Sequence, residues 1–311
     1  MSAPLLSVDE IIRRHPRERL FVQPVEWTGR HLELLQCSFE LRDDEEAPGR
    51  RTVRQEGQDA DPSDCRPFNY WTHEAESLAT SDSKNAVIRR ILTDRNGPFK
   101  CTRPFGFFHF GSDHTFRLHG LVFAPRSPRQ APGQDQPRPV FAFMQRGMIR
   151  IQRETAFPLP RPRRRQQLPN LPVAATRRLQ LKHLEPTDPC RDPYILAVLL
   201  GLAQAQAEAS SLIESGSANA WEGREYKVCA TFVDEEDTHH MNLYSANISV
   251  AFLSKFDYPK HLQTPQSPPL SSSLVIQQER FLYKPYSSLR QRLIDAITTH
   301  TELLESAAAE T

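Results

Sequence analysis

The sequence predicts an α+β fold in which a mainly antiparallel sheet packs against a buried central helix and a C-terminal helix. Four segments are rich in β-branched and aromatic residues and are expected to form the strands: 105–123, 140–151, 226–248 and 274–283. The chain also has 26 prolines against 12 glycines in 311 residues. Because proline is excluded from helix interiors and central strands, these prolines predict long connecting loops.

The central helix, expected over about 193–209, has the clearest pattern in the chain. Asp192 is a preferred N-cap residue, and Pro193 suits the first helical position. Apolar side chains surround most of the first three turns: Ile195, Leu196, Val198, Leu199, Leu200 and Leu202. The helix is therefore expected to be buried on nearly all sides.

The remaining elements follow from local signals along the chain. Ser7 and Glu10 form a capping-box pattern at the start of a short helix that ends at Arg14. Strand-like composition is expected over 31–41, in the two arms of a hairpin at 105–110 and 115–123, and in a second hairpin at 226–233 and 240–248. Helical spacing is expected at 83–92, 249–256 and in a terminal helix from Ser288.

The prolines cluster in four polar insertions, at about 42–67, 124–139, 157–172 and 258–270. These insertions predict a single α+β domain over 1–311 that is interrupted by loops. A weaker subdivision into 1–155 and 185–305 is the alternative organisation.

Bulk properties exclude several classes of protein. The net charge of +1 provides no global field toward nucleic acid or an anionic membrane. The apolar run from Tyr194 to Ala203 is too short to span a bilayer, and the N-terminus has no basic segment of a secretion signal. The five cysteines are scattered without a C-x-x-C pair, which favours reduced thiols. We therefore expect a cytoplasmic or nuclear protein, neither secreted nor membrane-bound.

One stretch of the chain is strongly basic. Between Val140 and His183, ten arginines and lysines accompany a single acid, Glu154. Exposed basic clusters bind acidic surfaces or act in nuclear import. The predicted partner-binding residues are Arg161, Arg163, Arg164, Arg165, Arg177 and Arg178. A solvated basic loop is the equally weighted alternative, and nucleic acid stays an open partner that the net charge does not indicate.

The leading functional hypothesis is therefore a non-catalytic interaction or regulatory protein that binds an acidic protein partner. Signatures of nucleotide-binding loops, serine hydrolases and zinc proteases are missing from the sequence. No cofactor is predicted under this hypothesis.

The alternative hypothesis is a metal-dependent, nuclease-like enzyme of the PD-(D/E)XK type, or an inactive relative of one. Glu225 and Lys227 are two residues apart at the start of a strand, so their side chains share a face. In such enzymes the carboxylate binds Mg²⁺ and the lysine stabilises charge near the phosphate. Asp192 would have to complete the site, although it already has a capping role. A same-face ion pair explains Glu225 and Lys227 more simply.

Two further groups are candidate metal ligands. Asp234, Asp237 and His239 lie in or beside a run of four acids between two expected strands, a composition that is also typical of solvated hairpin loops. In the first hairpin, a loop over 111–114 would pair His109 with Phe116 and place His109 and His119 on opposite faces. A shared metal would then require a bulge or a shifted register.

The C-terminal third of the chain resembles a group of uncharacterised proteins from filamentous fungi. The similarity covers about residues 188–295 and includes the motif D-P-Y-I-x(3)-L-L-x-L-A-Q of 192–204, Tyr226-Lys227-Val228, Leu243-Tyr244-Ser245-Ala246 and Tyr283-Lys284-Pro285-Tyr286. These segments are mostly expected to contribute to the hydrophobic core. The resemblance therefore implies a shared fold and carries over no functional residue.

Overall fold

A seven-stranded mixed sheet forms the centre of the protein, in a computed structural model that describes residues 7–42, 69–95, 97–111, 114–126, 138–158, 171–211, 224–256 and 273–301. Its strands are β1 (Cys37–Leu41), β2 (Phe99–Phe110), β3 (His114–Pro125), β4 (Phe141–Gln145), β5 (Glu225–Val233), β6 (His240–Ser249) and β7 (Leu274–Leu282). They are arranged in the order β1-β7-β6-β5-β4-β3-β2. The predicted α+β class is confirmed.

Four of the six strand pairs are antiparallel, as expected for a mainly antiparallel sheet. The pairs β1–β7 and β4–β5 are parallel. Parallel neighbours need a crossover connection, and between β4 and β5 this connection contains α5 (Arg146–Ala156), α6 (Leu171–Leu184), the short 3-10 helix η3 (Pro189–Arg191) and α7 (Pro193–Ser211).

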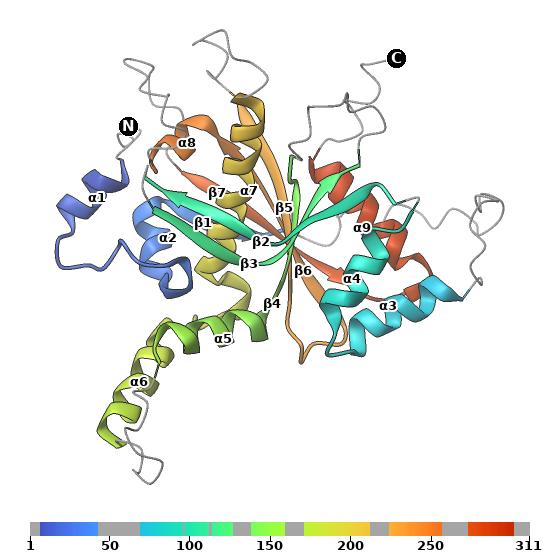
Figure 1. Ribbon diagram of the computed structural model, residues 1–311, viewed down its shortest axis with the longest axis horizontal. Helices are drawn as coiled ribbons and strands as arrows, with labels where there is room; N and C mark the ends of the chain where they lie inside the picture. Colours follow the sequence, from blue (N-terminus) through green and yellow to red (C-terminus); the bar gives the residue numbers. More distant parts are fainter. Residues whose placement is uncertain are drawn as a thin grey trace.

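Helices cover both faces of the sheet (Figure 1). One face packs against α7, with contributions from α1 (Val8–Arg14), η1 (Pro24–Glu26), α2 (Gly29–Leu35) and α8 (Val250–Ser254). The other face packs against α3 (Tyr70–Thr80), α4 (Lys84–Leu92) and the C-terminal helix α9 (Tyr286–Thr301). Two hydrophobic cores result, one on each side of the sheet.

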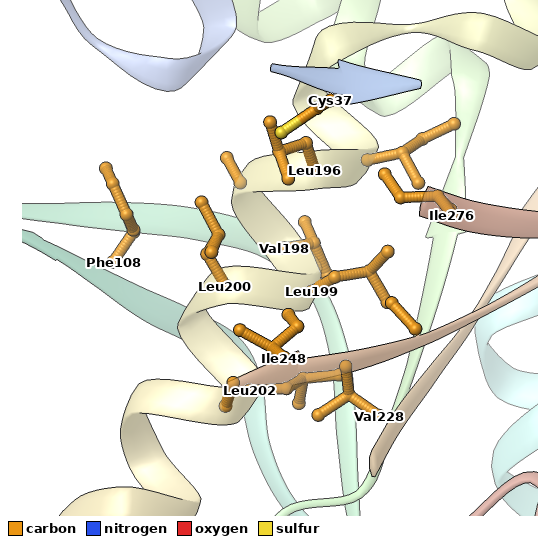
Figure 2. Close-up of a cluster of buried hydrophobic side chains, with 14 of the residues drawn as sticks. Cys37, Phe108, Leu196, Val198, Leu199, Leu200, Leu202, Val228, Ile248 and Ile276 are labelled. Carbon is orange, nitrogen blue, oxygen red and sulfur yellow. The ribbon is translucent and has the colours of Figure 1, made fainter. Parts of the chain in front are cut away.

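The helix α7 is the centre of the larger core, as its sequence predicts. Its residues from Pro193 to Gln204 are all buried, including Leu196, Leu199 and Leu200 with no exposed surface. Figure 2 shows these leucines among Phe108, Val228, Ile248 and Ile276, which come from four different strands. Burying a leucine fully stabilises a protein by roughly 1.5–3 kcal/mol, so this helix is a large contributor to the fold.

The β2–β3 hairpin differs from its predicted register by one residue. Phe110 pairs with His114 and His109 with Thr115, which leaves a loop of residues 111–113. Gly111 begins this loop with a φ of 66°, a left-handed conformation that glycine adopts readily. The predicted pairing of His109 with Phe116 was therefore wrong. Because a shift of one residue changes which side chains share a face, His109 and His119 lie on the same face.

Helical segments account for the other differences from the predicted elements. The expected strand 140–151 ends at Gln145, where α5 begins, and the expected strand 31–41 contains most of α2 before β1. The helices α3 and α6 are not among the predicted elements. The four predicted insertions lie mostly outside the described residues.

Four cysteines are described, Cys37, Cys101, Cys190 and Cys229, and all are free thiols. Burial raises the pKa of Cys37 to about 12, which makes its thiol a poor nucleophile. No helix in the described ranges is both long enough and apolar enough to cross a membrane.

Lys255 is a buried cation beside the larger core. Its side chain is almost fully enclosed, and Nζ donates a hydrogen bond to the carbonyl of Leu35 at 3.0 Å. The same Nζ lies 4.3 Å from the centre of the Phe252 ring. Burial lowers the pKa of Lys255 to about 8, because the charged form loses its hydration. At neutral pH the fold therefore carries the cost of a buried ammonium group.

We expect the stability of the protein relative to a Lys255→Met variant to rise with pH. Between pH about 8 and about 10.5 the unfolded chain keeps the lysine proton and the folded chain loses it, so the free energy of unfolding increases with pH. Compared with Lys255→Met, the free energy of unfolding should increase by at most about 3 kcal/mol over this pH range. Urea unfolding across this range measures it. Lys182→Met removes an exposed lysine and is the matched control. If the difference in free energy of unfolding between the natural chain and Lys255→Met did not change with pH, the lowered pKa of Lys255 would be contradicted.

Candidate functional site

A cleft of about 230 Å³ lies between α5, α6 and the segment that leads into α7. On α5 the lining residues follow helical spacing of three and four, so they share one face: Arg146, Ile149, Arg150, Arg153 and Glu154. The opposite wall is formed by Arg178, Leu181, Lys182, Glu185, Pro186, Pro189 and Asp192. Figure 1 shows α5 and α6 extending away from the sheet as an arm, and we call this surface the arm cleft.

Arg146 holds the start of the arm to the sheet. Its Nη1 lies 2.7 Å from Oδ2 of Asp234, at the end of the neighbouring strand β5. The backbone N–H of Gly147 donates to both carboxylate oxygens of Glu235, each at 3.0 Å. A carboxylate at a helix N-terminus satisfies free N–H groups and matches the positive end of the helix dipole. Two of the four acids in the turn after β5 are thus used to anchor α5.

Arg153 forms a buried ion pair at the base of the arm cleft. Its Nη2 donates to Oδ1 of Asp192 at 2.8 Å, and its Nε donates to the carbonyl of Val25 at 3.0 Å. The same Oδ1 accepts the backbone N–H of Tyr194 at 2.9 Å, which is the predicted capping of α7. The pair therefore joins the N-terminal segment, α5 and α7 at one point.

Three other cations in the arm cleft pair with no carboxylate of the described residues. The side chains of Arg150, Arg178 and Lys182 are exposed, and none of them forms a hydrogen bond or ion pair within the part of the chain that the structure describes. Five cationic and three carboxylate side chains line the arm cleft, which leaves a net charge of +2. The cleft is thus a local positive site on a chain of nearly zero net charge.

Arg177, one of the predicted partner-binding residues, forms hydrogen bonds within the chain. Its guanidinium donates to the carbonyl of Phe157 and, at 2.9 Å, to that of Glu154, so it holds α6 against the C-terminal end of α5. Arg178, the next residue, lines the arm cleft. The predicted binding residues Arg161, Arg163, Arg164 and Arg165 lie outside the described residues.

Apolar side chains are exposed on the same arm. Ile151 of α5 is 51% exposed, and Leu171 and Leu179 of α6 are 76% and 68% exposed. Leu184 is the only residue of α6 that is buried. These three side chains add exposed apolar surface to the arm.

The residues of the nuclease-like hypothesis do not come together. Side chains alternate along β5, so Glu225 and Lys227 lie on the face of the sheet that packs against α3, α4 and α9. Asp192 precedes α7 on the opposite face. Lys227 is close to the far end of α7, where its carbonyl accepts a hydrogen bond from Gln206. Asp192 is about 21 Å away from that point along the helix axis.

The acidic turn is organised by hydrogen bonds within the protein. Asp237 accepts the backbone N–H groups of His239 and His240, and its other oxygen lies 2.9 Å from Nδ1 of His240. Asp234 pairs with Arg146. Among the described residues, no cluster of three or more His, Cys, Asp or Glu side chains could hold a metal ion.

His109 and His119 share a face but lie far apart along the hairpin. His119 pairs with Phe105, four residues before His109 on β2. This spacing corresponds to about 13 Å along a strand, too far for two ligands of one metal ion. The shifted register therefore does not create a shared metal site.

No protein-family model matches the chain in sequence comparisons, and no curated protein matches it. The resemblance of residues 188–295 to fungal proteins and the expected cytoplasmic or nuclear location stay predictions.

Arg150 and Lys182 belong to the basic stretch of the sequence but are not among the predicted site residues. The missed signal was helix propensity: residues 171–184 consist largely of Leu, Ala, Arg, Gln and Lys, which favour helix. A helix over this segment would have placed Arg178 and Lys182 on one face, four residues apart.

We expect Arg153→Met to destabilise the protein by about 3–5 kcal/mol, because it leaves the Asp192 carboxylate buried without its partner. Adding Asp192→Asn should recover part of this loss, since the amide oxygen can still cap α7 without a charge. Urea unfolding followed by circular dichroism measures both. The control is Arg178→Met, on the exposed side of the same cleft, with an expected change within about 0.5 kcal/mol. Equal effects of Arg153→Met and Arg178→Met would contradict the buried pair.

Proposed function

We propose that this protein is a non-catalytic interaction module that binds an acidic segment of a partner protein in the arm cleft. The observation that supports the proposal most directly is the set of three exposed cations on two facing helices: Arg150, Arg178 and Lys182. Other cations of the cleft, Arg146 and Arg153, already pair with carboxylates of the chain. The three remaining cations are available for carboxylates of a partner.

The chemistry of the arm cleft favours a protein partner over nucleic acid. Glu154 and Glu185 line the cleft and would repel a phosphate backbone, whereas a peptide can place its carboxylates selectively. Nucleic-acid complexes typically neutralise more phosphates than three cations can, and single-strand binding uses aromatic side chains for stacking. No aromatic residue is among the described residues that line the cleft.

Apolar groups set a second requirement for the partner. Ile149, Leu181, Pro186 and Pro189 form part of the cleft wall between the charged groups. An apolar side chain flanked by carboxylates would bury surface against this wall while its neighbours pair with the cations. We therefore expect a segment that combines Asp or Glu with Leu or a similar residue.

The metal-dependent, nuclease-like alternative with Mg²⁺ has no observation in its favour among the described residues. Glu225 and Lys227 line neither the arm cleft nor the cavity between the β2–β3 hairpin and α7, and Asp192 is engaged by Arg153 and α7.

Charge reversal of the three exposed cations tests the proposal. We expect the triple variant Arg150→Glu, Arg178→Glu and Lys182→Glu to bind a short fluorescein-labelled peptide of alternating glutamate and leucine at least about tenfold more weakly than the natural chain, a loss of about 1.4 kcal/mol. Fluorescence anisotropy measures the affinity, and raising the salt concentration should weaken binding of the natural chain.

A matched control reverses three other exposed arginines, Arg17, Arg89 and Arg95, and should retain the affinity. Circular dichroism checks that both triple variants fold. Equal loss in the two variants would show nonspecific charge attraction and overturn the proposal. Tighter binding of a labelled single-stranded oligothymidylate than of the peptide would identify nucleic acid as the preferred partner and would also overturn it.

A further inference from the structure

A second cavity, of about 110 Å³, lies where the β2–β3 hairpin passes beside α7, and it shares no lining residue with the arm cleft. The helix supplies one wall through residues at helical spacing: Val198, Gly201, Leu202, Ala205 and Glu208. The first four are apolar or small, and Glu208 is exposed at the end of the row. The wall formed by α7 is therefore apolar except at one end.

The opposite wall is formed by the residues of the hairpin that face α7. Leu118 and Val122 of β3 lie an even number of positions apart, and both are buried in the larger core, which contains α7. His119 has the opposite orientation, because side chains alternate along a strand. Gly106, the partner of Leu118 on β2, completes this wall. Apolar groups thus face each other across the cavity.

Hydrogen bonds from α7 hold the hairpin in place beside this cavity. The Gln204 side chain accepts the backbone N–H of His109 on β2 and donates to its carbonyl, both at 2.8 Å. The Tyr194 hydroxyl accepts the backbone N–H of His119 on β3 at 2.6 Å. Because these hydrogen bonds fix both strands of the hairpin to one helix, the cavity between them is preformed.

Two glycines of the lining differ in what requires them. A side chain at Gly201 would collide with the carbonyl oxygen of Phe107, so the close approach of α7 and β2 requires glycine there. At Gly106 a Cβ atom would lie 3.6 Å from Cγ2 of Val122 and 3.8 Å from Cβ of Leu118, which are ordinary van der Waals contacts. Gly106 also has no positive φ that would require glycine. Glycine within a strand weakens it and often marks a place where a ligand approaches the backbone closely.

The space left at Gly106 is a cost to the protein unless a ligand fills it, because atoms around an empty cavity lose van der Waals contacts. Water is a poor occupant, since a buried water needs about two to four polar partners and the side chains that face each other here are apolar. Thr102, a polar residue of the lining, already donates its hydroxyl to the carbonyl of Val122 at 3.1 Å. The cavity therefore favours an apolar occupant.

We infer that this cavity binds a small, uncharged apolar molecule, which lies against Leu118, Val122 and Leu202 and fills the space left at Gly106. Apolar cavities of roughly 150 Å³ stay dry and bind benzene, and the present cavity of about 110 Å³ admits a molecule of this size or slightly smaller. A charged molecule would lose its hydration against these apolar groups, so the ligand is neutral. This site is independent of the function proposed for the arm cleft.

Benzene is a probe of this chemistry, and benzoate is a charged counterpart with the same ring. Titration of the full chain with benzene should cause saturable shifts of the methyl signals of Leu118, Val122 and Leu202 in proton–carbon spectra, because an aromatic ring shifts the signals of the groups beside it. The methyl signals of Leu289 and Leu293, in the core on the other face of the sheet, should not shift. Benzoate should bind at least about fivefold more weakly than benzene.

Gly106→Val should weaken benzene binding by at least about tenfold and raise the thermal midpoint of the ligand-free chain, because the new side chain fills the cavity. Ser38→Val, at an exposed position of the opposite edge strand β1, is the matched control and should leave the affinity for benzene unchanged. Ala205→Leu fills the same cavity from the wall of α7 and should also abolish the shifts. This variant keeps the site testable if Gly106→Val fails to fold.

Absence of saturable shifts in the natural chain would overturn the inference. Equal shifts in both cores would indicate nonspecific uptake of benzene, and full benzene affinity in a folded Gly106→Val or Ala205→Leu chain would place the ligand elsewhere. Either result would overturn it as well. Tighter binding of benzoate than of benzene would show that a charged group is recognised and would overturn the assignment to a neutral ligand.

Discussion

The buried ion pair between Arg153 and Asp192 is the contact on which the arrangement of the larger core depends. Asp192 caps the first turn of α7, and this turn enters the core with every side chain buried. A buried carboxylate is costly unless a cation and hydrogen bonds compensate it. Arg153 supplies the charge and also binds the carbonyl of Val25. The position of α5, and with it the arm, is therefore coupled to the same contact that starts the central helix.

A second constraint acts at the other side of α7, where the helix meets an edge strand. Unpaired backbone groups at a sheet edge favour association with other chains. Gln204 satisfies the N–H and the carbonyl of His109 on the edge strand β2, and Gly201 allows the backbones to approach closely. One helix thus organises the arm cleft through its N-terminus. Its middle and C-terminal part form one wall of a cavity of about 110 Å³ beside the β2–β3 hairpin, which we call the hairpin cavity. The two surfaces have different chemistry because one is formed by exposed charged helices and the other by apolar core positions.

The two cavities also differ in how rigid their walls are. Around the hairpin cavity, α7 is joined to β2 through Gln204 and to β3 through Tyr194, by side-chain hydrogen bonds and buried contacts. In the arm, α6 buries a single leucine and is held to α5 by hydrogen bonds from Arg177. Elements with few buried apolar contacts open at low free energy. The proposed acidic partner would therefore meet an adaptable surface in the arm, in contrast to the rigid walls of the hairpin cavity.

The sequence by itself determined the elements whose signals are local. Asp192 and Pro193 before a continuous apolar run predict α7, and alternating β-rich segments predict most of the sheet, because capping and side-chain period act within a few residues. The tertiary structure decided which basic residues are available. Arg150 and Arg153 belong to the same basic stretch, yet Arg153 meets Asp192 and Val25, which are 39 and 128 positions away. The hairpin register was likewise decided by one loop residue and by packing on α7. Partners so distant in sequence are chosen by packing of the whole chain, which no local pattern specifies.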